Sequence, residues 1–306
     1  MALGKRINTT KHRILSVCCV LGLSYLSFCL FFRFYQRQLI YRPHSKITLR
    51  PSAPDFNLSY TDVWIPVQGT SEQLHGWWLP ATANKTVTVL PQEPQSVLTE
   101  PKVILYFCGV GRNMSDYNYL SRASAFRQLG FSVLMFDYRG YGKSDGSFPA
   151  EAQLYEDSEA AWRFLRNHLK VPAEKIIIYG ESLGGAIALN LATQHPEAAA
   201  LIMQSSFTTM SNAVKSKPLS TLVPVDFILT EQFDSRSKIT QLEMPVLFIH
   251  GRTDSVVPVS MSETLYSLAP QPKQKLIIPE ADHVSIYKEG QYSYLRAIEK
   301  FMLSLP

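Results

Sequence analysis

Cysteine is scarce in this chain, and most of it lies at one end. Of the four cysteines among 306 residues, Cys18, Cys19 and Cys29 lie near the N-terminus and only Cys108 lies further along. One thiol cannot build a disulfide framework in the rest of the chain, which excludes the class of small domains held together by disulfides. The redox compartment stays open, because many single domains outside the cytosol also lack disulfides.

Acidic residues are absent from the first 50 positions, which contain nine Lys or Arg. The rest of the chain carries 21 basic and 25 acidic residues, so the net charge of +5 comes from the N-terminal part. Nothing in the remainder therefore suggests a nucleic-acid partner. The sequence also lacks any group of His, Cys and Asp with the spacing of metal ligands, so it predicts no metal and no other cofactor.

A long stretch without charge extends from Ile14 to Phe32, nineteen residues flanked on both sides by Lys and Arg. This length is sufficient for a helix to cross a bilayer, so residues 14–32 are predicted to be a single-pass transmembrane anchor. Residues 1–13 are then a basic tail and residues 33–57 a juxtamembrane link. The basic flanks suit anionic lipid headgroups, and their presence on both sides leaves the orientation in the membrane open.

A cleaved signal peptide is the alternative interpretation of the uncharged stretch. Such a peptide ends in small residues with an Ala-x-Ala arrangement, which is missing near Phe32. The uncleaved anchor is therefore favoured.

The change in charge and hydrophobicity near residue 50 also predicts that a chain beginning near Ser52 folds by itself and hydrolyses small soluble esters at an undiminished rate.

Strand-like and helical patterns alternate from Val103 to the C-terminus. This alternation predicts an α/β fold with a mostly parallel sheet that helices cover on both faces. The predicted strands are residues 103–107, 131–136, 175–179, 199–204, 245–250 and 274–278. The predicted helices are residues 116–128, 151–168, 183–194, 259–268 and 290–303.

Three further segments complete residues 58–306, the predicted globular domain. Residues 59–67 and 74–80 alternate polar and apolar side chains, which is typical of an antiparallel hairpin, here at the edge of the sheet. Residues 81–101 are a polar loop. The interval 207–243 interrupts the strand and helix alternation, is too long for a simple connection, and is predicted to be a small lid.

The predicted strand at 175–179 leads directly into Gly180-Glu181-Ser182-Leu183-Gly184 and then into a helix. Many such pentapeptides are ordinary turns, but between a strand and a helix this one has the pattern of a nucleophile elbow. In that elbow the glycines permit a tight turn that exposes the serine hydroxyl. Ser182 is therefore the predicted nucleophile, and the backbone N–H of Leu183, at the helix N-terminus, is the predicted oxyanion donor.

A carboxylate and a histidine follow two later strands. Asp254 comes after the strand at 245–250, and His283 comes after the strand at 274–278. Taken singly, Asp254 could equally form a turn and His283 could be a loop residue at the surface. Loops at the carboxyl ends of parallel strands meet at one edge of the sheet, so the order Ser, Asp, His predicts a catalytic triad there. His250, at the end of its strand, is predicted only to pack.

From about residue 60 to its end the chain resembles an α/β-hydrolase. The motifs that carry the resemblance are Gly180 to Gly185, Asp137 to Ser144 and Gly251 to Asp254. More narrowly, the chain is similar to the membrane-anchored α/β-hydrolase-domain proteins that include eukaryotic protein depalmitoylases, and to bacterial relatives described as serine aminopeptidase-like. The resemblance implies the α/β-hydrolase fold and the activity of a serine hydrolase.

The resemblance also implies a second oxyanion donor in the loop after the strand at 103–107. The family usually has His-Gly-x there, whereas this chain has Cys108-Gly109-Val110. A backbone donor survives replacement of a side chain, so the N–H of Val110 is the predicted second donor. Cys108 is predicted to be a buried, inert thiol, and whatever the usual histidine organises is absent.

Two hypotheses from different classes follow. The first is a membrane-anchored serine hydrolase that cleaves an ester, thioester or amide of a small-molecule or acylated substrate through an acyl-enzyme on Ser182. The apolar character of the interval 207–243 favours esters or thioesters over peptides. The second is a membrane-tethered binding module that has the fold without turnover, and the altered loop at Cys108 supports it. In both, membrane lipids contact the anchor and its basic flanks.

Overall fold

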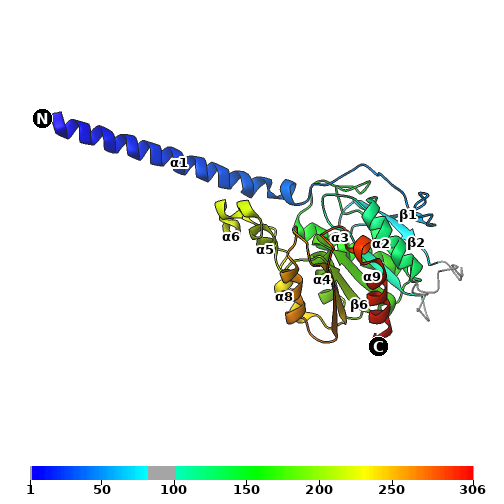
Figure 1. Cartoon of the computed structure of the whole chain (residues 1–306). Helices are drawn as coiled ribbons and strands as arrows, with labels where there is room; N and C mark the ends of the chain where they lie inside the picture. The colour runs from blue at the N-terminus through cyan, green and yellow to red at the C-terminus, as the bar shows by residue number, and fades with distance from the viewer. Residues whose placement is uncertain (1, 82–100, 306) are drawn as a thin grey trace.

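The computed structural model describes residues 2–81 and 101–305, which form a long N-terminal helix and a layered α/β body (Figure 1). Within these residues eight strands form one sheet, in the spatial order β1-β2-β4-β3-β5-β6-β7-β8. The pairs β1–β2 and β2–β4 are antiparallel, and all later neighbours are parallel. The strands are β1 Thr61–Pro66, β2 Gln73–Leu79, β3 Val103–Phe107, β4 Ser132–Phe136, β5 Ile176–Glu181, β6 Ala200–Gln204, β7 Val246–Gly251 and β8 Lys273–Ile278.

Helices cover both faces of the sheet, because the central strands are apolar on both sides. Along β5, Ile176 and Ile178 point into one core and Ile177 and Tyr179 into the other. Helices α3, α4 and α8 pack on the first face, and α2 and α9 pack on the second. These helices are α2 Tyr117–Gln128, α3 Glu151–Arg163, α4 Leu183–Gln194, α8 Val259–Leu268 and α9 Ile286–Leu303.

The predicted mostly parallel sheet with helices on both faces is confirmed, and its predicted strands agree closely with β3 to β8. The predicted edge hairpin is β1 and β2. Two helices differ from their predictions: α3 changes at Phe164 to a wider π-helical turn that ends at His168, and α9 begins at Ile286 rather than residue 290. The loop predicted at 81–101 lies, except for its end residues, outside the described part of the chain.

The N-terminal helix α1, Ala2–Ile40, contains the predicted anchor and continues beyond it. Its portion from His12 to Ile40 is long and apolar enough to cross a membrane. The link predicted at 33–57 is therefore helical in its first eight positions, up to Ile40. No proline or glycine interrupts these positions, and the helix ends shortly before Pro43, since the residue that precedes a proline disfavours the helical conformation.

The last turns of α1 pack against the α/β body, whereas the sequence predicts a globular domain that begins at residue 58. Tyr41 is fully buried, and its hydroxyl donates a hydrogen bond to the buried carboxylate of Glu231. Arg37 pairs with the other oxygen of Glu231 at 3.0 Å. The backbone carbonyl of Tyr41 accepts hydrogen bonds from the N–H of Gly111 and from the hydroxyl of Tyr141. The globular part therefore includes the end of α1.

The interval 207–243 folds into a series of short helices beside the end of α1 (Figure 1). Pro218 follows α5 and begins the 3-10 turn, and Pro224 separates that turn from α6, so these elements stay short. Between α6 and α1 the side chains of Arg33 and Gln36 donate to the carbonyl of Ile228, and the N–H of Thr230 donates to Gln36. The helices are α5 Met210–Lys215, a 3-10 turn Pro218–Leu222, α6 Val225–Ile228, α7 Ser235–Lys238 and a 3-10 turn Ile239–Gln241.

A buried carboxylate begins the loop after β4. Asp137 is 2% exposed; its Oδ1 accepts the N–H of Met114 at 2.7 Å, whereas its Oδ2 has no hydrogen-bond partner among the described residues. Burial raises the pKa of Asp137 to about 7, although the Met114 N–H acts in the opposite direction. The folded protein therefore binds a proton at Asp137 more tightly than the unfolded chain does.

This proton binding predicts a pH-dependent effect of Asp137→Asn. The pKa of Asp137 is higher in the folded state, so its contribution to the free energy of unfolding falls as pH rises from about 4 to about 7. Asparagine does not ionise, so relative to the wild type the variant becomes more stable across this window, by at most about 4 kcal/mol. Urea unfolding at pH 4.5 and pH 8 measures the change, with the exposed Asp55→Asn as control. An equal difference between wild type and variant at both pH values contradicts the prediction.

Candidate active site

Ser182 occupies the sharp turn between β5 and α4. Its backbone has φ 55° and ψ −121°, a conformation that costs energy for any residue with a side chain. The turn is possible because its neighbours are glycines. A Cβ at Gly180 would lie 2.2 Å from the carbonyl oxygen of Gly184, and a Cβ at Gly184 would lie 2.3 Å from that of Phe107. The Gly-x-Ser-x-Gly pattern thus has a steric cause at both glycines.

The second glycine gives a testable consequence. In Gly184→Ala the new methyl group collides with the carbonyls of Phe107 and Cys108, which are backbone atoms at the end of β3. We expect the loop after β3 to move by about 1 Å and kcat/KM to fall about 100-fold. Steady-state hydrolysis of a soluble ester measures this, with Thr193→Ala on the same helix as control. Wild-type kinetics in Gly184→Ala would show that the loop is not part of the site.

The structure brings together the three residues that the sequence nominates. The Nε2 of His283 lies 3.1 Å from the hydroxyl oxygen of Ser182, and its Nδ1 lies 2.7 Å from Oδ2 of Asp254. These residues follow β5, β7 and β8, whose carboxyl ends lie at one edge of the sheet. The imidazole is in position to exchange a proton with Ser182 while the carboxylate holds its other nitrogen.

Asp254 is held in its ionised form. Its side chain is fully buried, and Oδ1 accepts the N–H groups of Val256 and Val257 at 2.8 and 2.7 Å. Burial by itself raises the pKa of Asp254, but hydrogen bonds from His250, His283 and the Val257 N–H outweigh it and hold the pKa well below the usual range of a carboxylic acid. Asp254 therefore offers a charged acceptor to His283 at neutral pH.

His250 is a contact of the triad that the sequence interpretation missed. It is fully buried, and its Nε2 lies 3.2 Å from Oδ2 of Asp254 and 2.9 Å from the carbonyl oxygen of Val257. Its position near the end of β7, four residues before Asp254, could have predicted this contact from the sequence. Its polar contacts among the described residues are with Asp254 and Val257, so it positions the carboxylate rather than reacting.

The loop after β3 lies beside Ser182. A Cβ at Gly109 would be 3.5 Å from the Cβ of Ser182, which places Val110 next to the turn. Leu183 is the first residue of α4, where a backbone N–H has no partner within the helix. Leu183 thus directly follows the serine, and the loop that contains Val110 lies beside it. The hydroxyl of Tyr138 donates to the carbonyl of Cys108 at 3.0 Å and holds the start of the loop.

Cys108 does not have the environment of a reactive thiol. Its side chain is 3% exposed, and burial raises its pKa well above the usual value, with Asp137 and Glu181 acting in the same direction. The thiolate, which is the reactive form, is therefore disfavoured. Cys108 is thus a small buried side chain at the start of the loop after β3.

A buried ion pair lies beneath the turn. Arg122 from α2 and Glu181, the residue before Ser182, approach to 2.5 Å, and both side chains are at most 5% exposed. The Nε of Arg122 also donates to the hydroxyl of Tyr106 on β3. Because Arg122 contacts both Tyr106 and Glu181, it joins α2 to β3 and to the serine turn. Removal of either partner of the ion pair would leave an uncompensated buried charge. Sequence alone offered no pattern for it.

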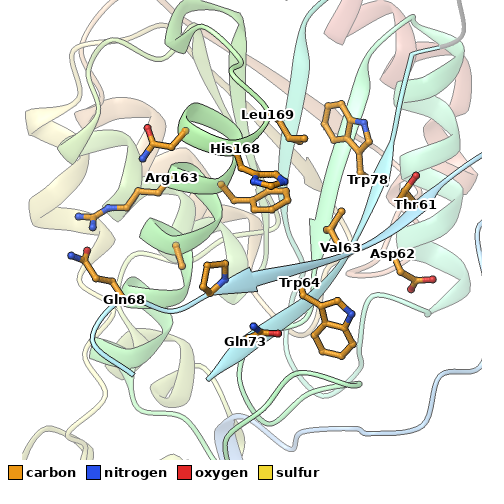
Figure 2. Close-up of a pocket in the computed structure, with 14 residues that line it drawn as sticks. Thr61, Asp62, Val63, Trp64, Gln68, Gln73, Trp78, Arg163, His168 and Leu169 are labelled. Carbon is orange, nitrogen blue, oxygen red and sulfur yellow. The ribbon is translucent and has the colours of Figure 1, made fainter. Parts of the chain in front are cut away.

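A hollow of about 970 Å³ lies away from the triad, between the β1–β2 hairpin and the end of α3 (Figure 2). Trp64 and Trp78 from the hairpin and His168 and Leu169 from the turn after α3 line it. None of its lining residues belongs to the triad or to the loop at Val110. The position of the serine, and not this hollow, therefore identifies the candidate active site.

The part of the chain that the structure describes contains no group of three or more His, Cys, Asp or Glu side chains that could hold a metal ion. The candidate site is thus built from Ser182, His283, Asp254 and backbone N–H groups.

Comparison with known proteins identifies the family of this chain. The profile of the serine aminopeptidase S33 family matches residues 99–230. A Mycobacterium tuberculosis protein, Rv2307c, is 33% identical over 89% of this chain and 88% of its own length. Two eukaryotic relatives are the protein bem46 of Schizosaccharomyces pombe, 28% identical over 81% of this chain and 80% of its own length, and human alpha/beta hydrolase domain-containing protein 17B, 32% identical over 57% of each.

Solved structures support the same fold. An esterase of Pyrococcus furiosus superposes with a TM-score of 0.66 at 18% identity, over 86% of this chain and 97% of its own. At this identity the likeness concerns the fold alone.

Proposed function

Because the chain belongs to the α/β-hydrolase superfamily, we propose that it is a serine hydrolase that forms an acyl-enzyme on Ser182. The observation that carries the proposal is the contact of His283 with both Ser182 and the ionised Asp254. The serine hydroxyl has an imidazole to accept its proton, and the imidazole has a carboxylate to stabilise its charged form.

The reaction proceeds in two steps. The hydroxyl oxygen of Ser182 attacks the substrate carbonyl carbon while Nε2 of His283 takes the serine proton. The N–H groups of Leu183 and Val110 stabilise the oxyanion, and the imidazolium returns the proton to the leaving group as the acyl–heteroatom bond breaks. Water then attacks the acyl-enzyme with His283 as base, and Ser182 and the acid are released. Asp254 stabilises the imidazolium in both steps.

An ester or thioester is the favoured substrate class. A peptidase that removes N-terminal residues needs a free carboxylate to hold a substrate ammonium group. Two acids near the segment 207–243 are already engaged: the buried Glu231 accepts from Arg37 and from the N–H of Glu151, and the half-buried Glu151 accepts from the N–H of Phe233. An acyl chain needs no charged partner, so a small acylated molecule or an acylated protein fits the site better.

Helix α1 is the membrane anchor in this proposal. Its apolar stretch is exposed along its length, and such a surface is stable in lipid rather than in water. The basic residues on its flanks contact anionic headgroups. The enzyme is thus a single-pass membrane protein with its active site close to the bilayer.

An active-site probe tests the catalytic part of the proposal. A fluorophosphonate should label the wild type covalently and should not label Ser182→Ala. Cys108→Ala is the matched control, because it removes the other nucleophile near the site and should leave labelling unchanged. Label on Ser182→Ala would disprove the assignment of the nucleophile.

The altered loop at Cys108 favours one alternative, a membrane-tethered binding module without turnover. Such a module would hydrolyse no short p-nitrophenyl ester above the rate of Ser182→Ala. Ester hydrolysis that depends on Ser182 excludes it.

A further inference from the structure

Two large apolar side chains are exposed in the segment beside α1. Phe227 on α6 is 89% exposed, more than Phe34 of α1 at 73%, and Leu222 at the end of the preceding 3-10 turn is 58% exposed. Single exposed apolar side chains are common, but two large ones in one short segment beside the lipid-facing helix mark a surface that another phase or molecule covers.

The position of these side chains along α1 is defined by hydrogen bonds. Arg33 is the first charged residue after the uncharged stretch 14–32, and its guanidinium donates to the carbonyl of Ile228 at 3.2 Å. Gln36, one turn further, accepts the N–H of Thr230 at 2.7 Å and is 6% exposed. The end of α6 is therefore level with the end of the apolar stretch, where headgroups meet acyl chains.

Positive charge accompanies the exposed apolar side chains. Arg33 donates to a carbonyl and not to an acid, and Lys217, just before the 3-10 turn, donates to the carbonyls of Ser255 and Val256 at 2.9 and 2.6 Å. Asp226, the acid within this segment, pairs with Lys215 at 2.5 Å, so Arg33 and Lys217 leave a net positive charge near the surface. Each such charge contributes about 1 kcal/mol of attraction to an anionic leaflet.

We propose that residues 218–228 form a second membrane contact, in which Leu222 and Phe227 lie among lipid acyl chains beside α1. The inference rests on the part of the proposed function that places α1 across a bilayer. The occupant of this surface is the bilayer itself, because the surface is continuous with the lipid-facing helix and carries the charge that anionic lipids attract.

This contact connects the bilayer to the active site. Lys217 binds the backbone of Ser255 and Val256, which directly follow Asp254, and the side chain of Val256 is 47% exposed. Lys217 therefore ties the start of the segment 218–228 to the loop of Asp254. The substrate class that benefits is an ester or thioester whose acyl chain is embedded in the membrane.

Site-specific photo-crosslinking tests the contact without any need for catalysis. A benzophenone amino acid is placed at Phe227 in the full chain, reconstituted in vesicles of equal parts phosphatidylcholine and phosphatidylglycerol. Tyr292, on α9 and 59% exposed, is the control position. We expect lipid adducts at least about fivefold more abundant at position 227, in keeping with an apolar ring that lies within the interface.

The outcomes separate the inference from the proposed function. Alkaline carbonate extraction first shows whether α1 is inserted; release of the chain would overturn both the anchor and this contact. If the chain stays in the membrane and positions 227 and 292 give equal adduct yields, only the second contact is wrong. Labelling of Ser182 by fluorophosphonate is independent of either result.

A kinetic comparison adds a second readout. In the double variant Leu222→Ser, Phe227→Ser, kcat/KM on a vesicle-embedded thioester should fall about tenfold relative to kcat/KM on a soluble short ester, since two apolar anchors are lost from the interface. Tyr292→Ser should leave that ratio unchanged. An unchanged ratio in the double variant contradicts the inference.

Discussion

Replacement of Ser182 by alanine should reduce kcat by about 10⁶-fold, and the further replacement of His283 should reduce it little more. The two side chains act as one unit: without the serine oxygen the imidazole has no proton to take, and without the imidazole the oxygen is a weak nucleophile. The residual rate comes from the backbone donors at Leu183 and Val110.

Single and double variants, assayed on one soluble ester under single-turnover conditions, measure this non-additivity. His250→Gln is the comparison that separates reaction from positioning. Among the described residues the polar contacts of His250 are with Asp254 and a backbone carbonyl, so its loss should cost about one hydrogen bond, or roughly tenfold in kcat, with little change in KM. Strictly additive losses for Ser182→Ala and His283→Ala would show that the two residues do not share a step.

Deletion of residues 1–51 should lower the free energy of unfolding by about 3–5 kcal/mol, whereas a chain that begins at Arg33 should keep its stability. The shorter chain loses the buried ring of Tyr41 and leaves the carboxylate of Glu231 without its partners from α1. We therefore do not expect the chain from Ser52 to be the self-sufficient domain that the sequence predicts. Charge and hydrophobicity change at residue 50, but Tyr41 and Arg37, which precede it, still contact the domain.

The same deletion should also reduce kcat, because the carbonyl of Tyr41 holds the N–H of Gly111, next to the oxyanion donor Val110. Urea unfolding and soluble-ester kinetics on both truncated chains measure the two effects. Tyr41→Ala in the full chain is the matched variant and should reproduce most of the stability loss. Equal stability and kcat for the chains beginning at Arg33 and Ser52 would show that the end of α1 only tethers the domain.

The sequence by itself determined the features whose causes are local. Alternating runs of strand and helix, the uncharged stretch at 14–32 and the glycines around Ser182 each lie within a few residues of the structure they produce. The order Ser182, Asp254, His283 could be derived as well, because parallel strands bring their carboxyl ends to one edge whatever the details of packing. Such inferences need only periodicity and topology.

Only the tertiary structure decided the contacts between distant segments. Tyr41 and Glu231 are 190 residues apart, and no local pattern marks either as a partner of the other. The same holds for Arg122 with Glu181 beneath the serine turn, whose 2.5 Å ion pair joins α2 to the end of β5. Side-chain burial and hydrogen bonding depend on which surfaces meet, and that is settled by the packing of the whole chain rather than by any segment of it.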